Sequence, residues 1–365
     1  MKIIFCGGGT AGHITPALAI AEYLKINNSP EILFIGREGG EENRAIKESG
    51  FELETIKVKG FDRKINLDNF KKVIMMAHAI KKAKKIIKDF SPDVVIGTGG
   101  YVSWPVLRVA QSLKIPTVIH ESNACPGLVT KLLSKKCNKV LLNFEGSEKE
   151  FKRKDNIKIV GNPVREKFLT ENKFEVRKRL GIGKGDFLIS SFGGSGGSEK
   201  INEVIIEFMQ EHSSKNKKIR HIHSCGNKYF PEIDTQYPEL TRGKSGCVIL
   251  PYIDNMSEVI LASDIVISRC GAMTISEICA AGVASILIPS PNVTNNHQYK
   301  NAKLICELDA AIMIEESELT LRKLIDTVKE LETNSQKRKS LSDKIKKFYL
   351  RDSKKIIADE ILKLI

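Results

Sequence analysis

The residues of this 365-residue chain whose types and spacing best suggest chemistry lie in three glycine-rich segments. The first, Gly7-Gly8-Gly9-Thr10-Ala11-Gly12-His13, follows a β-branched run and precedes an apolar helical pattern. Glycines let backbone amides approach an anion closely, and a helix N-terminus adds the positive end of its dipole. The segment therefore predicts a phosphate site, with Thr15 as the N-cap of the following helix and Pro16 as its first residue.

Two further glycine turns follow other strand patterns. Thr98-Gly99-Gly100-Tyr101 comes after residues 93–96, and Gly193-Gly194-Ser195-Gly196-Gly197-Ser198 comes after residues 187–192. If the strands before the first two segments are neighbours in one sheet, these two turns form a double cradle wide enough for a diphosphate. The third turn lies in the other half of the chain, so we expect two phosphorylated ligands that face one cleft.

His13 stands at the end of the first segment, where we expect its side chain to point into the cleft. A histidine accepts a proton near neutral pH, and a sugar hydroxyl that is about to attack needs one removed. The alternative interpretation is a histidine that caps or hydrogen-bonds the loop, and on sequence the two stand equal.

A fourth segment, Ser268-Arg269-Cys270-Gly271-Ala272-Met273-Thr274-Ile275-Ser276-Glu277, leaves a strand pattern and starts a helix. Its small residues bring backbone amides up to a sugar or phosphate, and the Glu277 carboxylate can accept hydrogen bonds from two ribose hydroxyls. A carboxylate that only complements the helix dipole is the alternative. Downstream, Asn295-Asn296-His297-Gln298 supplies amides suited to sugar hydroxyls.

These segments need a scaffold of short strands that alternate with helices, which predicts an α/β fold with parallel sheets. Strand patterns occur at residues 2–6, 31–35, 53–58, 93–96, 117–120, 139–142 and 158–160, and again at 187–192, 220–224, 247–250, 265–268, 285–288 and 311–314. Turn residues at 161–165 separate the two series. We therefore expect domains at 1–164 and 165–349, with a C-terminal helix at 350–365 that packs back towards the first.

The composition narrows the class of protein. The net charge is +14, and residues 57–88 hold eleven Lys or Arg residues against two Asp, which predicts an anionic partner such as nucleic acid or acidic lipid. The eight cysteines include no Cys-x-x-Cys pair, which indicates reduced thiols and no zinc site. No Asp-x-Asp occurs, so we expect no protein-bound metal and no cofactor. No apolar run is long enough for a signal peptide or a membrane span.

Two other classes of function are weighed against these residues. Gly7, Gly9 and Gly12 satisfy a dinucleotide fingerprint, which suggests an NADP-dependent oxidoreductase. However, the second strand pattern ends in Gly36-Arg37-Glu38, without the usual acid for the ribose. A basic nucleic-acid-binding protein is the other class, but no aromatic-rich basic motif or recognition helix is evident.

Over its full length the chain resembles the MurG family of peptidoglycan glycosyltransferases, which has the GT-B fold of two Rossmann-like domains facing across a cleft. The resemblance rests on seven blocks in the same order: residues 8–13, 98–101, His120-Glu121-Ser122-Asn123, Gly161-Asn162-Pro163-Val164-Arg165, 193–197, 269–277 and the region of Gln298. Ala11 stands where the family usually has glycine, which requires that residue to keep a negative φ.

The resemblance implies a hexosyltransferase that moves N-acetylglucosamine from UDP-N-acetylglucosamine to the 4-hydroxyl of the muramyl sugar of lipid I, with inversion, forming lipid II. Our own choice for the catalytic base is His13, because it combines a position in the glycine loop with a side chain that can accept a proton near neutral pH. The donor residues that the resemblance implies are Thr10, Ala11, Gly12, Asn123, Arg165, Ser195, Ile253, Ala272, Met273, Thr274, Ile275, Ser276, Glu277 and Gln298. The acceptor residues are Thr10, Gly12, His13, Gly99, Gly100 and Tyr101.

The same family implies a peripheral protein at the cytoplasmic face of the cell membrane, with no nucleic-acid partner. In the basic segment, lysines flank an apolar helical face that contains Phe70, Val73, Ile74, Ala77 and Ile80. Such a surface suits anionic lipid, although the apolar face suits a domain core equally well. We therefore assign the membrane contact to the lysines alone.

Overall fold

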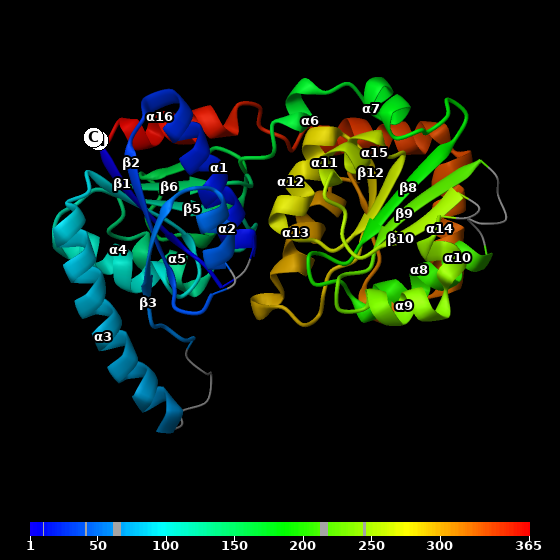
Figure 1. Ribbon diagram of the computed structural model, residues 1–365. Helices are drawn as coiled ribbons and strands as arrows, with labels where there is room; N and C mark the ends of the chain where they lie inside the picture. Colours follow the sequence, from blue (N-terminus) through cyan, green and yellow to red (C-terminus); the bar gives the residue numbers. More distant parts are fainter. Residues whose placement is uncertain (10, 41, 61–66, 212–217, 244–245) are drawn as a thin grey trace. The chain divides into compact units, whose positions relative to one another are not determined.

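The computed structural model describes residues 1–9, 11–40, 42–60, 67–211, 218–243 and 246–365. The chain divides into two compact units, Met1–Val164 together with Leu350–Ile365, and Arg165–Tyr349. Each unit contains a parallel sheet with helices on its faces (Figure 1).

The first unit is built on a sheet with the strand order β3-β2-β1-β4-β5-β6-β7. Its strands are β1 (Lys2–Gly7), β2 (Glu31–Arg37), β3 (Glu52–Ile56), β4 (Val94–Gly99), β5 (Thr117–Glu121), β6 (Lys139–Leu142) and β7 (Ile157–Ile159). Side chains alternate between the two faces of a strand, so Ile3 and Phe5 enter one apolar cluster and Ile4 and Cys6 enter the other. Both faces are buried, as parallel sheets require.

Helices cover both faces of this sheet. They are α1 (Ala11–Asn28), α2 (Glu42–Glu48), α3 (Leu67–Phe90), α4 (Ser103–Ser112), α5 (Leu128–Leu133), the 3₁₀ turn η1 (Ser147–Glu150) and α16 (Ser353–Leu362). Helix α16 lies against α1, and its Ile357 and Ile361 are fully buried. The C-terminal helix therefore completes the core of the first unit.

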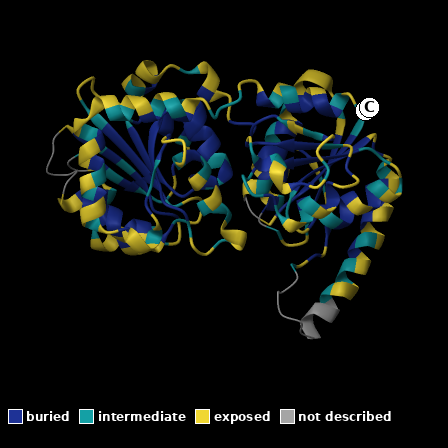
Figure 2. Ribbon diagram, turned by 180° about the vertical axis from the view of Figure 1, so that it is seen from behind, coloured by how far each residue is buried: buried dark blue, intermediate teal, exposed yellow. Residues whose placement is uncertain are grey.

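The second unit repeats the architecture with the strand order β10-β9-β8-β11-β12-β13. Its strands are β8 (Phe187–Phe192), β9 (Ile219–Ser224), β10 (Cys247–Leu250), β11 (Ile265–Ser268), β12 (Ala284–Leu287) and β13 (Ile312–Met313). Ile189 and Leu188 point to opposite faces, each into its own apolar cluster. Figure 2 shows that both sheets are buried while the surrounding helices alternate buried and exposed residues.

The helices of the second unit follow the strands in alternation. They are α6 (Lys167–Thr170), α7 (Lys173–Arg179), α8 (Glu199–Glu211), α9 (Phe230–Gln236), α10 (Pro238–Thr241), α11 (Met256–Ala262), α12 (Ala272–Ala281), η4 (Thr294–Asn296), α13 (His297–Cys306), η5 (Glu316–Glu318), α14 (Leu321–Thr333) and α15 (Ser335–Lys346). The expected α/β fold with two parallel sheets is confirmed.

One expected helix start is wrong. Helix α1 begins at Ala11, four residues before Thr15, and Pro16 lies inside it. Proline has no N–H to donate to Gly12, but only one backbone bond is lost, close to the helix start. As a helical residue, Ala11 has the negative φ that an L-residue adopts freely. Thr10 lies outside the described residues.

Candidate active site

The first two glycine segments are in direct contact. Strands β1 and β4 are neighbours, with Gly7 opposite Gly99. A Cβ built on Gly100 would lie only 2.0 Å from the Gly8 carbonyl oxygen, and Gly100 has a φ of +82°. Only glycine allows both this backbone conformation and this approach. The neighbouring strands that the sequence analysis required are therefore present, and they bring the two turns together.

His13 belongs to the first turn of α1 and contacts the second glycine segment. Its Nδ1 lies 3.1 Å from the Thr98 carbonyl oxygen, and a Cβ on Gly99 would lie 2.4 Å from the same Nδ1. Because a carbonyl oxygen only accepts, Nδ1 is the donor in this hydrogen bond. The neutral ring then carries its lone pair on Nε2, the nitrogen that can take up a proton. His13 thus hydrogen-bonds the loop, which is the alternative that the sequence analysis left open for it.

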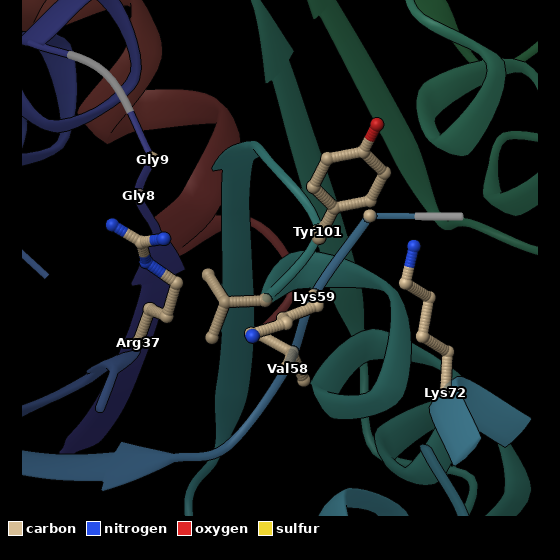
Figure 3. A pocket seen from close by; sticks show the side chains of 9 residues that line it. Gly8, Gly9, Arg37, Val58, Lys59, Lys72 and Tyr101 are labelled. Atoms are coloured by element: carbon tan, nitrogen blue, oxygen red, sulfur yellow. The ribbon is translucent and has the colours of Figure 1, made fainter. Parts of the chain in front are cut away.

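A pocket of about 390 Å³ adjoins these turns. Gly8, Gly9, Arg37, Val58, Lys59, Gly60, Lys72, Tyr101 and Val102 line it (Figure 3). Three of these residues are cations that the sequence analysis did not select for the site, and they come from β2, the segment after β3, and α3. Tyr101 is 48% exposed, and its ring packs on the backbone of Gly60. The pocket is suited to an anionic ligand. Gly12, which the resemblance places with both substrates, follows the first glycine turn in α1 and is exposed.

Asn123 is held by Glu121, a residue that the sequence analysis placed in a motif but gave no role. The Glu121 Oε1 accepts from the backbone N–H and the side-chain Nδ2 of Asn123, both at 3.1 Å. Its Oε2 accepts from Thr130 Oγ1 at 2.9 Å and from the backbone N–H of Gly127 at 3.3 Å. The buried carboxylate therefore fixes the loop after β5 and the orientation of the Asn123 amide.

In the second unit, Arg165 and Glu277 form an ion pair through two parallel hydrogen bonds. Nε donates to Oε1 at 2.7 Å and Nη2 donates to Oε2 at 3.0 Å. Burial disfavours the charged guanidinium, but the hydrogen bonds and charge of Glu277 outweigh it and raise the pKa of Arg165 above its ordinary value. Two of the donor residues that the resemblance implies are thus adjacent.

Most other residues of the fourth segment have buried side chains. Ile275 is fully buried, Ala272 and Ser276 are nearly so, and the Ser276 hydroxyl donates to the Ala272 carbonyl oxygen. Met273 and Thr274 are half-buried at the start of α12, where no side chain caps the helix. A ligand here would meet mainly the backbone N–H groups of the first helical turn.

A second pocket, of about 440 Å³, lies beside the third glycine turn. Gln298 lines it, and its Oε1 accepts from the backbone N–H groups of Cys270 and Ser290 at 3.2 and 3.0 Å. Ser195 is exposed in the turn, whereas Gly193, Gly197 and Ser198 line the pocket itself. Gln298 therefore joins the loop before α12 to the loop after β12.

Arg269 is a buried cation in the lining of this second pocket, and the sequence analysis gave it no role of its own. Its Nη2 donates to Ser198 Oγ at 2.6 Å and pairs with Glu316, and its Nη1 donates to the Pro289 carbonyl oxygen at 3.2 Å. These bonds fix the base of the glycine turn. Ile253, one of the donor residues that the resemblance implies, is 2% exposed, so its side chain contributes packing.

Metal-ligand clusters and disulfides are both absent from the described parts of the chain. No group of three His, Cys, Asp or Glu residues there could hold a metal ion. None of the eight cysteines forms a disulfide, and burial raises the pKa of the Cys6 thiol to about 12. Such a thiol stays protonated at neutral pH and is a poor nucleophile.

Comparisons with known proteins agree with this geometry. Residues 3–142 match the glycosyltransferase family 28 N-terminal domain, and residues 188–357 match the C-terminal domain of the same family. The fold is that of the crystal structure of Acinetobacter baumannii MurG, a GT-B glycosyltransferase, with a TM-score of 0.78 and 24% identity over 99% of both chains.

Two relatives named UDP-N-acetylglucosamine--N-acetylmuramyl-(pentapeptide) pyrophosphoryl-undecaprenol N-acetylglucosamine transferase align over the whole of this chain. The one from Thermoanaerobacter sp. (strain X514) is 44% identical and is covered over 99% of its length. The one from Clostridioides difficile (strain 630) is 39% identical and is covered over 89%. The oxidoreductase alternative is not supported by these relatives. The chain therefore belongs to this family of N-acetylglucosamine transferases, within glycosyltransferase family 28.

Proposed function

We propose that this chain transfers N-acetylglucosamine from UDP-N-acetylglucosamine to the 4-hydroxyl of the muramyl sugar of lipid I, forming lipid II. The first unit, residues 1–164 with the C-terminal helix, would bind the acceptor, and residues 165–349 would bind the donor. The observation that carries the proposal is the contact between two glycine turns, with His13 bonded to one of them. Family membership supplies the identity of the two substrates.

His13 acts as the general base in this proposal. The acceptor 4-oxygen attacks the anomeric carbon, the bond from that carbon to the diphosphate oxygen breaks, and UDP departs. The hydroxyl proton passes to Nε2, because the bond from Nδ1 to Thr98 fixes the tautomer. One direct displacement inverts the anomeric carbon. Thr10, Gly12, Gly99, Gly100 and Tyr101 would surround the acceptor.

The donor would bind along the start of α12. Glu277 would accept hydrogen bonds from the ribose hydroxyls while Arg165 holds its carboxylate. Arg165 and Ile253 would lie by the uracil, Ile253 through its backbone because its side chain is buried. Backbone N–H groups at the start of α12 and of the glycine turn at Ser195 would meet the diphosphate, so that no metal is needed. The remaining donor residues in this proposal are Thr10, Ala11, Gly12, Asn123, Ala272, Met273, Thr274, Ile275, Ser276 and Gln298.

We further propose a peripheral contact of α3 with anionic lipid at the cytoplasmic face of the membrane. Val73 and Ile74 are 54% and 47% exposed, whereas Ala79 and Ala83 further along α3 are buried in the core. Exposed lysines at 81, 82, 84 and 85 flank this face. Anionic lipid attracts such lysines, to which alone the sequence analysis assigned this contact. Because the structure leaves Val73 and Ile74 exposed, we extend the proposed contact to these two side chains, which would enter the headgroup region. Within the part of the chain that the structure describes, no helix has both the length and the apolar character to span a bilayer.

The test is release of UDP from UDP-N-acetylglucosamine, with and without a short-chain lipid I analogue, in buffer that contains a chelator. We expect release that depends on the acceptor. Release that requires added magnesium would contradict the metal-free donor site and leave the reaction standing. A folded protein that binds UDP but releases none with acceptor would contradict the reaction.

A further inference from the structure

The pocket beside the first glycine turn carries cations that the proposed function does not use. Arg37 ends β2, Lys59 follows β3, and Lys72 lies near the start of α3. Figure 3 shows the Arg37 guanidinium beside Gly8 and the Lys59 side chain extending towards Arg37, while the Lys72 side chain extends from α3 apart from them. We propose that Arg37 and Lys59 bind the diphosphate of the lipid-linked acceptor and make the enzyme prefer a diphosphate over a single phosphate. This inference rests on the proposed function.

Arg37 is placed for a ligand rather than for an internal ion pair. Its Nε is buried and, among the described residues, has no hydrogen-bond partner. Arg37 lines the pocket, so a ligand there would meet the rest of its guanidinium group. The planar guanidinium binds phosphate oxygens through two parallel hydrogen bonds, which an ammonium group does not.

Glu42 is the acidic residue that packs against the same loop, and it lies behind the loop. It is buried, and a Cβ on Gly8 would lie 2.2 Å from its Oε1. That Oε1 is 3.4 Å from the backbone N–H of Arg37, which donates to it. Glu42 therefore supports the glycine turn and the Arg37 backbone without lining the pocket.

The charge of the pocket matches the acceptor. A diphosphate esterified at both ends carries one negative charge on each phosphate, and Arg37 and Lys59 supply one positive charge for each. The amides of the turn at Gly8 and Gly9 add further donors. The donor diphosphate is a poorer candidate, because the residues proposed for UDP lie in the other unit.

The position of Lys72 connects the pocket to a lipid-linked ligand. Lys72 lines the pocket, and the next two residues of α3, Val73 and Ile74, are the exposed apolar side chains assigned above to the membrane surface. An acceptor whose lipid remains in the bilayer could thus place its diphosphate beside Arg37 and Lys59. A soluble dinucleotide has no lipid chain, so its binding would not require a pocket close to the membrane surface.

The experiment compares Arg37→Gln, Lys59→Gln and the double variant with the wild type, on short-chain acceptors that carry a diphosphate or a single phosphate. We expect each single variant to lower kcat/KM for the diphosphate acceptor about 10-fold, and the double variant about 100-fold. The loss on the monophosphate acceptor should be smaller, so the preference shrinks. KM for UDP-N-acetylglucosamine should not change.

Matched controls are Arg44→Gln and Lys47→Gln, which remove exposed cations from the neighbouring helix α2. Both should keep the wild-type preference. Arg37→Lys should retain part of it, because the charge stays while the paired hydrogen bonds are lost. Lys59 is an exposed side chain, so Lys59→Gln tests the inference in a folded protein even where Arg37→Gln unfolds.

Direct binding separates this inference from the reaction. Calorimetry should show that the wild type binds a short prenyl diphosphate more tightly than the prenyl monophosphate, and that the double variant loses this difference. Wild-type protein without acceptor-dependent UDP release would overturn the reaction, while intact diphosphate binding would keep the pocket assignment. An unchanged diphosphate preference in the double variant would overturn the inference. Binding of NADPH by the wild type that is lost in Arg37→Gln would also overturn it. So would a defect of the variants that is seen only when anionic vesicles are present.

Discussion

Arg165 and Glu277 are 112 residues apart in the chain, yet they meet through two hydrogen bonds of 2.7 and 3.0 Å. The Glu277 side chain is 9% exposed and that of Arg165 is 45% exposed. The guanidinium therefore holds both carboxylate oxygens in one plane at the open side of α12. Each oxygen keeps a second lone pair, so the carboxylate can accept from two ribose hydroxyls without losing Arg165.

Glu277→Gln should weaken donor binding more than acceptor binding. The amide replaces one accepting oxygen with a donor, which cannot accept from the guanidinium or from a ribose hydroxyl. We expect the Kd for UDP-N-acetylglucosamine to rise about 10- to 100-fold, from the loss of a hydrogen bond to a charged group. Calorimetry with UDP and UDP-N-acetylglucosamine measures the change.

The control for this variant is Glu258→Gln, which removes another acidic partner in the same unit. Glu258 pairs with Lys167 at 2.7 Å and with Arg179. Its loss should lower thermal stability and leave the donor Kd unchanged. An equal change in Kd for the two variants would mean that Glu277 acts only through folding.

His13→Ala should lower turnover with little change in donor binding. Removing a general base from a hydroxyl that attacks costs about 100- to 10,000-fold in rate. The measurement is kcat with the short-chain acceptor, beside the Kd for UDP-N-acetylglucosamine. His78→Ala is the control, because His78 is exposed on α3 and its hydrogen bond within the described ranges goes to the local Ile74 carbonyl oxygen. Equal losses of kcat and donor binding in His13→Ala would contradict a base.

The strands were the most predictable part of the fold. Residues 139–142, 187–192, 247–250 and 265–268 were predicted as strands with the bounds that the structure has. Each is a short run of mostly buried residues bounded by polar or turn residues, and at 247–250, on the edge of its sheet, buried and half-buried residues alternate, so the local pattern suffices. The helix start at Ala11 was missed because Thr15-Pro16 imitates a capping signal inside the helix.

Contacts between distant segments could not be predicted from local patterns. Arg37 and Lys59 enter one pocket because β2 and β3 are adjacent in the sheet, a pairing that spacing does not reveal. Likewise, His221 and His223 on β9 both bond the hydroxyl of Ser191 at 2.8 Å, beneath the third glycine turn. A single polar residue in a strand pattern does not indicate which other residues it will hydrogen-bond in the core, so this buried network could not be predicted.

We expect the first unit to become less stable in acid, because protonation of Glu360 removes its ion pairs. The carboxylate on α16 is 3% exposed and contacts Lys139, Lys158 and Lys363 at 3.3, 2.9 and 2.5 Å. Burial alone would raise its pKa, but hydrogen bonds from the lysines outweigh it and lower the pKa from 4.5 to about 2. Between these values the unfolded chain binds the proton and the folded chain does not. The contribution to stability is therefore complete above pH 4.5 and disappears as the pH falls to about 2.

Glu360→Gln should thus lower the free energy of unfolding by about 2 kcal/mol at neutral pH and by much less in acid. Chemical denaturation of the two proteins across this pH range measures the difference. Asp359→Asn is the matched control, since Asp359 is the exposed neighbour on the same helix. A difference between wild type and Glu360→Gln that does not vary with pH would show that the effect comes from packing and not from charge.

Gly100→Ala should disturb both the stability of the first unit and the acceptor reaction. The new methyl group would meet the Gly8 carbonyl oxygen at 2.0 Å, and a φ of +82° is unfavourable for alanine. Backbone cannot rotate away as a side chain does, so we expect a loss of about 2 to 4 kcal/mol in the free energy of unfolding. The two glycine turns must separate, so kcat/KM for the acceptor should fall while the donor Kd stays the same.

Gly146→Ala provides the comparison that isolates the contact between the turns. Gly146 has a φ of +86° in the same unit, but a Cβ there meets nothing within 4 Å. The Gly146→Ala variant therefore has an unfavourable backbone conformation but no steric clash, and we expect its free energy of unfolding to fall by about 1 to 2 kcal/mol. Denaturation and acceptor kinetics of the two variants should differ, with Gly100→Ala the more damaged in both. Equal stability and equal kcat/KM would mean that the close approach of Gly8 and Gly100 is not needed to hold the acceptor.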